Sequence, residues 1–211
     1  MSEAGYLTLA PGCTPGAEIE VKRSRFLAVL RRVSDEEAAR VVIEEARRAH
    51  RDARHHCTAF ILGPEPAIER SNDDGEPSGT AGAPMLEVLR GNEISDVVAV
   101  VTRWFGGTLL GTGGLARAYA DAVREALAGV RLVRRSELSR VDLALPHADA
   151  GRIETDLRAA GVQVIGADYG TLVRLRLATG DPAGLAARIA ELTTGAVVPT
   201  AAGTVWVDLP V

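Results

Sequence analysis

The sequence predicts an α+β protein with two domains, residues 18–135 and residues 138–211. Three observations lead to this prediction. The segment 96–101 carries a continuous apolar run, which is typical of a central strand that is covered on both faces. Apolar residues recur at helical spacing over 115–127 and give the clearest helical face in the chain. Beyond residue 140 the hydrophobic pattern begins afresh as strand, helix, two strands, helix and strand, the order of a ferredoxin-like βαββαβ domain.

The first domain follows a loose start that is rich in glycine and proline. Residues 34–37 form a capping box that opens a helix, which extends to about Ala49. Pro84 suits the first turn of a short helix that Gly91 can close in a left-handed conformation. The polar stretch 72–82 is interpreted as a functional loop. The expected elements are strand 25–33, helix 34–49, strands 56–62 and 67–71, helix 85–90, strand 96–101, helix 115–127 and strand 130–134.

An arginine-rich stretch, 131–140, is interpreted as the boundary between the two domains. In the second domain, the alternating strand 172–177 directs Arg174 and Arg176 away from the helices. In one register of the last strand, Trp206 lies on the same sheet face, and the three residues form a secondary binding surface. Alternatively, Trp206 packs against the first domain or a partner subunit, because an exposed tryptophan is unfavourable. The expected elements are strand 141–145, helix 149–160, strands 162–168 and 172–177, helix 182–192 and strand 197–209.

The composition argues against several functions. The chain of 211 residues has a formal net charge of −4, so it lacks the basic excess of a typical nucleic-acid-binding domain, and only a local basic patch could bind RNA. Lys22 is the sole lysine, which leaves almost no candidate for a Schiff-base or Walker lysine. No long apolar segment or signal peptide is present, and we therefore expect a cytoplasmic protein without membrane contact. Cys13 and Cys57 are too few for a disulfide framework.

The Gly-rich stretch Arg103–Gly114 joins the most buried strand to the best helix. Free backbone N–H groups and the positive end of the helix would converge there, and an anion could bind. We expect the Arg103 side chain to point toward the Gly-rich turn. In one alternative, the glycines only let helix and strand pack closely. In another, Gly111, Gly113 and Ala116 match the G-x-G-x-x-A pattern of a dinucleotide site, but this pattern does not follow the strand directly.

A second stretch, 71–84, concentrates three carboxylates, Asp73, Asp74 and Glu76, among turn-forming residues. Carboxylate oxygens could hold a hard cation, although the spacing does not match a calcium loop. The same pattern is typical of an ordinary turn followed by a helix cap such as Thr80, or of a loop for protein recognition. His55 and Cys57 would share one strand face, but two ligands do not make a zinc site. We predict no metal site and no cofactor.

Four motifs in this order resemble the IMPACT/YigZ family: 22–26 (KRSRF), 54–60 (RHHCTAF), 73–82 (DDGEPSGTAG) and 102–119 (TRWFGGTLLGTGGLARAY). The resemblance spans about residues 18–129, and the rest of the chain is similar to the small ferredoxin-like domain that bacterial members append. Where many relatives carry a tyrosine, this chain has Trp104, which preserves an aromatic side chain.

The resemblance implies a first domain with the left-handed βαβ fold of a small-subunit ribosomal protein and of the fourth domain of elongation factor G. It implies a second domain similar to that factor's fifth domain. Eukaryotic relatives regulate translation by competing for the activator of an amino-acid-starvation kinase. The implied function here is a non-catalytic binding or regulatory protein linked to translation, which contacts RNA, a ribosomal surface or a protein partner.

The residues expected on the binding surface are Asp73, Asp74, Glu76, Thr80, Arg103, Gly106, Gly107, Gly111, Gly113, Gly114 and Arg117. The alternative is an enzyme that acts on a phosphorylated or nucleotide ligand. In that case the three carboxylates would hold Mg²⁺, and Arg103 would stabilise phosphate charge.

Overall fold

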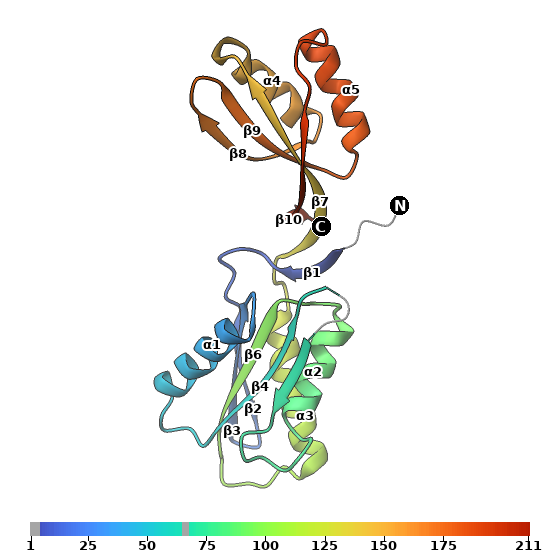
Figure 1. The fold of residues 1–211 in the computed structure, drawn as a ribbon. Coiled ribbons are helices and arrows are strands. Elements are labelled where there is room, and N and C mark those ends of the chain that lie inside the picture. The colour runs from blue at the N-terminus through green and yellow to red at the C-terminus, as the bar shows by residue number, and fades with distance from the viewer. Residues whose placement is uncertain (1–4, 65–67) are drawn as a thin grey trace. The chain divides into compact units, whose positions relative to one another are not determined.

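The computed structural model describes residues 5–64 and 68–211, and the chain divides into two compact units (Figure 1). One unit comprises Tyr6–Arg134 together with Pro210–Val211. The other comprises Arg135–Leu209 together with Gly5. Both units mix helices and strands, so the predicted α+β class is confirmed. Ala67, the first residue of the expected strand 67–71, lies outside the described residues.

The first unit is built on a five-stranded antiparallel sheet in the order β2-β3-β6-β4-β5. Strands β3 and β4 each pair with β6 between them, so they run parallel to each other, and helix α1 connects them. The elements are β2 (Gly16–Val21), β3 (Ser24–Arg32), α1 (Glu36–Ala49), β4 (His55–Leu62), β5 (Ile68–Asn72), α2 (Gly82–Gly91), β6 (Val97–Trp104) and α3 (Thr112–Leu127).

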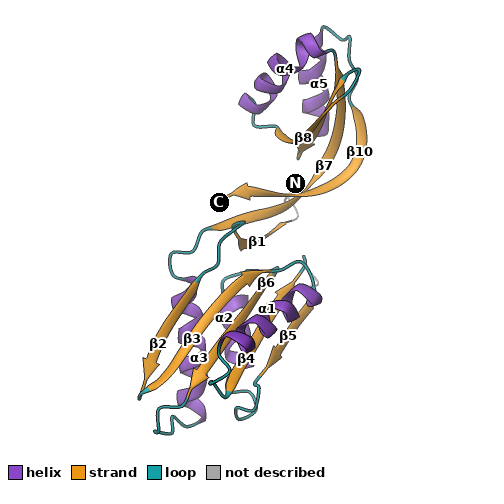
Figure 2. Cartoon of the chain, turned by 90° about the vertical axis from the view of Figure 1, so that its left-hand side faces the viewer, coloured by secondary structure: helices purple, strands orange, loops and turns teal. Residues whose placement is uncertain are grey.

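Helices cover both faces of this sheet, as Figure 2 shows. Helix α1 packs on Val98 and Val100 of β6, whereas α2 and α3 cover the face of Val97, Ala99 and Val101. Strand β6 is therefore buried on both sides, which explains its continuous apolar run. Helix α3 buries a stripe of apolar residues, including the fully buried Tyr119, in agreement with the helical periodicity.

Two strands that the sequence did not indicate, β1 and β2, precede β3. Strand β1 (Gly5–Leu9) precedes β2, and its Leu9 is fully buried in the core of the first unit. Strand β1 also makes a parallel bridge from Leu7 to Ile94. Because the strand pairs with segments that are distant in sequence, local patterning gave no signal for it.

In the second unit, strands and helices alternate as βαββαβ, as predicted for a ferredoxin-like domain. Within this unit the strands have the order β7-β9-β8, and β10 also pairs with β7. Three leucines of the sheet, Leu143, Leu175 and Leu177, pack against both helices. The elements are β7 (Leu132–Leu145), α4 (His147–Ala159), β8 (Gln163–Tyr169), β9 (Val173–Thr179), α5 (Pro182–Thr193) and β10 (Thr200–Pro210).

Strand β7 differs from the prediction, because one continuous strand replaces the two short strands expected over 130–134 and 141–145. The arginine-rich stretch 131–140 is therefore mostly strand, and the chain divides into its two units within this stretch, between Arg134 and Arg135. Within the described residues, no helix combines the length and the apolar character that crossing a membrane requires.

Candidate functional site

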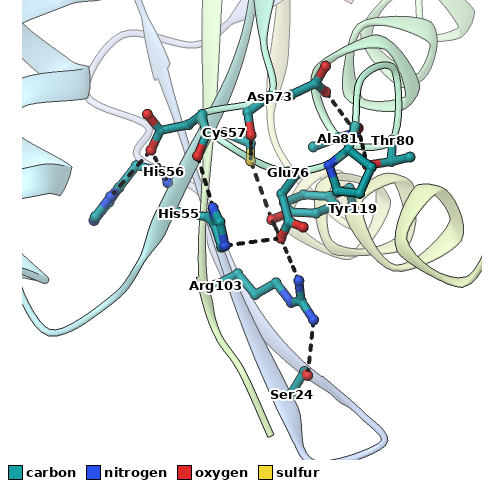
Figure 3. A network of polar contacts seen from close by, with 12 residues as sticks. Ser24, His55, His56, Cys57, Asp73, Glu76, Thr80, Ala81, Arg103 and Tyr119 are labelled. Carbon is teal, nitrogen blue, oxygen red and sulfur yellow. Dashed lines mark hydrogen bonds and ion pairs between the residues drawn. The ribbon is translucent and has the colours of Figure 1, made fainter. Parts of the chain in front are cut away.

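A buried polar network lies where the two Gly-rich stretches meet (Figure 3). Arg103, near the end of β6, pairs in register with His55 on β4 and Phe26 on β3. Its Nη1 donates to Oε1 of Glu76 at 2.5 Å, and the hydroxyl of Tyr119 donates to the same oxygen at 2.8 Å. The side chains of Arg103 and Glu76 are only 7% and 3% exposed. This ion pair thus links β6, the 72–82 loop and α3 in the core.

The Arg103 side chain, which we expected on the binding surface and directed toward the Gly-rich turn, is buried beside that turn. Its Nη2 lies 3.5 Å from Oγ of Ser24, and its guanidinium lies 5.4 Å from the ring of Phe26 and 5.7 Å from that of Phe105. The buried carboxylate of Glu76 accounts for this inward orientation, because an unpaired charge in the core would be strongly unfavourable. Arg103 and Glu76 therefore support the surface from beneath.

Cys57 completes the network, with its Sγ 3.0 Å from the carbonyl oxygen of Asp73 and 3.3 Å from the hydroxyl of Tyr119. Burial raises the pKa of the Cys57 thiol to about 12. Burial, together with the neighbouring Cys57 and Glu76, also raises the pKa of the Tyr119 phenol well above its usual value. Both groups remain protonated at neutral pH, so neither is an activated nucleophile.

Asp73 organises the 72–82 loop. One carboxylate oxygen accepts from the backbone N–H of Gly79 at 2.8 Å, and the other accepts from Ala81 at 3.0 Å and Gly82 at 2.8 Å. Burial alone would raise the pKa of Asp73, but these three backbone hydrogen bonds outweigh it and lower the pKa. The carboxylate also lies at the start of α2, where it satisfies N–H groups that would otherwise lack partners.

Asp74 also forms several hydrogen bonds within the protein. Its carboxylate accepts from the backbone N–H of His56 at 2.7 Å and from Arg47 at 3.2 Å. Its carbonyl oxygen lies 2.9 Å from Nδ1 of His55. Thr80, another residue expected on the binding surface, is buried, and its hydroxyl donates to the carbonyl oxygen of Pro77 at 2.6 Å. The described residues contain no group of His, Cys, Asp and Glu side chains arranged to hold a metal ion.

The β2–β3 turn and the loop after β6 contact each other and form a surface next to this network. A Cβ atom on Gly106 would lie 2.0 Å from the carbonyl carbon of Arg23, so only glycine permits this close approach. The backbone N–H of Gly106 donates to Oγ of Ser24 at 3.1 Å, and Arg23 donates to Oγ1 of Thr108 at 3.3 Å. The turn is therefore fixed on the Gly-rich loop.

The turn residues themselves, Lys22 and Arg23, both have positive φ, 47° and 66°. Two-residue hairpin turns of this kind usually contain Asn and Gly, because long side chains are strained there. Neither residue is among the site residues expected from the sequence. The sequence feature that could have identified them is a pair of cationic residues at turn positions that favour asparagine and glycine.

Two large apolar side chains project from the loop after β6: Phe105 is 51% exposed and Leu109 is 82% exposed. The following helix α3 begins after Gly111, which has a φ of 73°, and its first turn has neither a capping side chain nor an acidic residue. We define the loop rim as the surface formed by these segments. Its members are Lys22, Arg23, Phe105, Gly106, Gly107, Thr108, Leu109, Gly111, Thr112, Gly113 and Gly114.

The remaining expected residues lie elsewhere. Arg117 is exposed on α3 and lines a groove between α2 and α3, with its Nε donating to the carbonyl oxygen of Gly113 at 3.2 Å. In the second unit, Arg174 is exposed, and Arg176 forms an ion pair with Asp168 at 3.2 Å. Trp206 on β10 is partly buried. Charge on this sheet face is thus partly neutralised within the unit.

Comparison with known proteins finds a match to the Impact N-terminal domain over residues 22–127. The chain is 38% identical to IMPACT family member YigZ of Escherichia coli over 182 residues, which is 84% of this chain and 89% of that protein. It is 45% identical to IMPACT family member YvyE of Bacillus subtilis over 141 residues, 67% of this chain but only 65% of that protein. A crystal structure of a hypothetical protein, 35% identical, superposes over 96% of this chain and 98% of its own with a TM-score of 0.63.

Proposed function

This chain belongs to the IMPACT family, and we propose that it is a non-catalytic, translation-linked binding protein whose loop rim binds single-stranded RNA. The link to translation extends to this chain the role that the resemblance implies for eukaryotic relatives. The assignment to RNA, and not to another partner, depends on the chemistry of the rim.

The observation that carries the proposal is that the loop rim combines positive charge, backbone hydrogen-bond donors and an aromatic side chain, and lies next to a buried ion pair. No carboxylate occurs over residues 103–120, while Arg23 lies against Gly106 and Thr108 and the neighbouring Lys22 is exposed. The buried Arg103–Glu76 pair fixes the strand end below. A local patch of this kind can bind anions although the chain as a whole is acidic.

Each part of the rim matches a part of a single-stranded nucleic acid. The cationic turn and the free N–H groups at the start of α3 suit phosphate oxygens. The ring of Phe105 offers a stacking platform, and such contacts contribute about 1–3 kcal/mol per base. With so few charges, the dependence of affinity on salt should be shallow. The rim carries no set of side chains able to read a base sequence, so binding should be weakly specific.

The contacts of the three carboxylates argue against the alternative that the protein is an enzyme. Asp73 and Asp74 use both of their oxygens to accept hydrogen bonds, and Glu76 is buried against Arg103 and Tyr119. A magnesium ion would have to break contacts that hold the loop and the start of α2 together. The geometry therefore favours a structural role for these three residues.

The test is a fluorescence-anisotropy titration of labelled 12-nucleotide poly(U) RNA and of duplex RNA with the full chain, over a salt series. The double variant Lys22→Asn, Arg23→Gly removes both charges and suits the positive φ of the turn. We expect it to weaken binding at least tenfold and to reduce the salt slope by about two, one for each phosphate that the turn no longer neutralises. Phe105→Ala should weaken binding without changing the slope.

The matched control is Arg48→Ala, which removes an exposed charge near the end of α1, on the other face of the sheet. It should leave the affinity within twofold. If the wild type fails to bind either RNA at low salt, the proposal is wrong. A crosslinker attached at residue 109 would then test whether the rim binds a protein partner.

A further inference from the structure

A groove of about 710 Å³ lies between α2 and α3 in the first unit. On α3 the groove is lined by Ala116 and Ala120, two small residues that lie one helical turn apart. On α2 it is lined by Val88 and Gly91. Val88 and Ala120 are buried at the bottom, and Ala116 is half-buried. The floor is therefore apolar and admits the close approach of another backbone.

The dimensions of the groove favour an elongated ligand. The α3 residues that line it extend from Ala116 to Leu127, which corresponds to about 16 Å of helix at 1.5 Å per residue. Three turns of a second helix have about the same length.

The charges around the groove are unequal. On α2, Glu87 pairs with Arg90, and on α3, Arg124 pairs with Asp121. Arg117 has no carboxylate partner within the described part of the chain. It lies close to the start of α3, where the first turn carries no acidic residue and the helix dipole adds positive potential. One end of the groove is thus complementary to an acidic side chain.

We propose that this groove binds an amphipathic helix of a protein partner, with an apolar face at i, i+4 and i+7 spacing and an acidic residue opposite Arg117. Helix-in-groove binding of this type uses apolar anchors for affinity and a flanking charge for orientation. Arg117 at one end of the groove donates to the carbonyl oxygen of Gly113, a member of the loop rim, so the two surfaces adjoin.

The test uses a displayed library of 14-residue peptides with a helix-favouring background, in which only the residues of one face are randomised. Peptides enriched on the full chain are synthesised and titrated into ¹⁵N-labelled protein. We expect an enriched apolar stripe with Asp or Glu at one end, and amide shifts that centre on Val88, Gly91, Ala116 and Ala120. Ala116→Trp, which fills the groove, should lower the affinity at least tenfold.

Arg117→Glu should also lower the affinity at least tenfold, and a peptide with its acidic residue changed to Arg should restore binding. This variant changes an exposed residue and keeps the test decisive if Ala116→Trp fails to fold. Arg48→Glu, an exposed charge reversal on the other side of the sheet, is the control and should leave affinity within twofold. Shifts centred elsewhere, or no acidic preference, would overturn the proposal. A self-association that Ala116→Trp abolishes would instead identify a second copy as the occupant.

Discussion

At the scale of single residues, the buried Arg103–Glu76 pair has the largest expected effect on stability. Arg103→Ala leaves the carboxylate of Glu76 buried without its cation, and removal of one partner of such a pair typically costs about 3–5 kcal/mol. Arg40→Ala, which breaks the exposed pair with Glu36 at 3.4 Å, should cost less than about 1 kcal/mol. Urea unfolding of both variants measures this difference.

The double variant Arg103→Met, Glu76→Leu refines the same prediction. It removes both charges and fills a similar volume, so it should be more stable than Arg103→Ala alone. If Arg103→Ala unfolds at the wild-type urea midpoint, the pair contributes little, and Arg103 could again be considered for direct ligand contact.

Two glycines of the same Gly-rich stretch should differ sharply. Gly106→Ala places a methyl group 2.0 Å from the Arg23 backbone, and the turn must move, at a cost of about 1–3 kcal/mol. Gly113→Ala adds a methyl group in open space inside the first turn of α3 and should stabilise by up to about 1 kcal/mol. Thermal melts test this pair. Equal effects of the two variants would mean that the hairpin is not fixed by Gly106.

The thiol of Cys57 provides a prediction on pH. Its pKa is about 12 in the folded chain against 9.0 for an unperturbed thiol, so the folded state retains a proton that the unfolded state loses. The resulting stability is complete below pH 9 and decreases as the pH rises toward 12. In Cys57→Ala, unfolding midpoints should decline less between about pH 8 and pH 10.5. Identical slopes for the two proteins would contradict the burial of Cys57.

At the scale of elements, local patterns predicted the parts whose burial repeats regularly. The apolar run of β6 and the stripe of α3 reflect layers of helices on both faces of one sheet. The contacts of Asp73, Glu76 and Arg103 were not predictable in the same way. Their partners lie up to 79 residues away, and a strand-end arginine gives no local sign of its orientation. The sequence therefore located the two stretches, while the fold decides which side chains point inward.

The loop 72–82 and helix α2 should respond together to the loss of Asp73. Asp73→Ala removes one accepted hydrogen bond within the loop, from Gly79, and two at the start of α2, from Ala81 and Gly82; loss of a helix cap costs about 0.5–2 kcal/mol. Because the folded pKa of Asp73 is lowered, its contribution is present above pH 3.8 and declines as the pH falls below that value. Hydrogen exchange at 79–86 should accelerate in Asp73→Ala. Asp181→Ala, which removes the cap of α5, should leave those amides unchanged.

At the scale of the whole molecule, the order of elements from β3 onward and a division within 131–140 followed from the sequence, but strands β1 and β2 and the N-terminal limit of the first unit did not. Strand β7 runs through the expected boundary, and β1 lies outside the expected domain 18–135 although it contributes to the core. Both differences have one cause: non-local strand pairing is invisible to periodicity. We therefore propose residues 6–134 as the independently folding N-terminal domain.

This proposal predicts that fragment 6–134 folds and that fragment 18–135 is much weaker. The shorter fragment loses Leu9, which is fully buried, and the hydrogen bonds from Ala10 N–H to Arg131 and from Ser95 N–H to Leu7. Loss of a buried leucine side chain alone costs about 2–5 kcal/mol, a large part of the roughly 5–15 kcal/mol that stabilises a typical domain. Calorimetry should give a cooperative melt for 6–134 and a much lower or absent transition for 18–135. Leu9→Ala in the full chain separates the side chain from the strand, and equal melting temperatures for both fragments would show that β1 is dispensable.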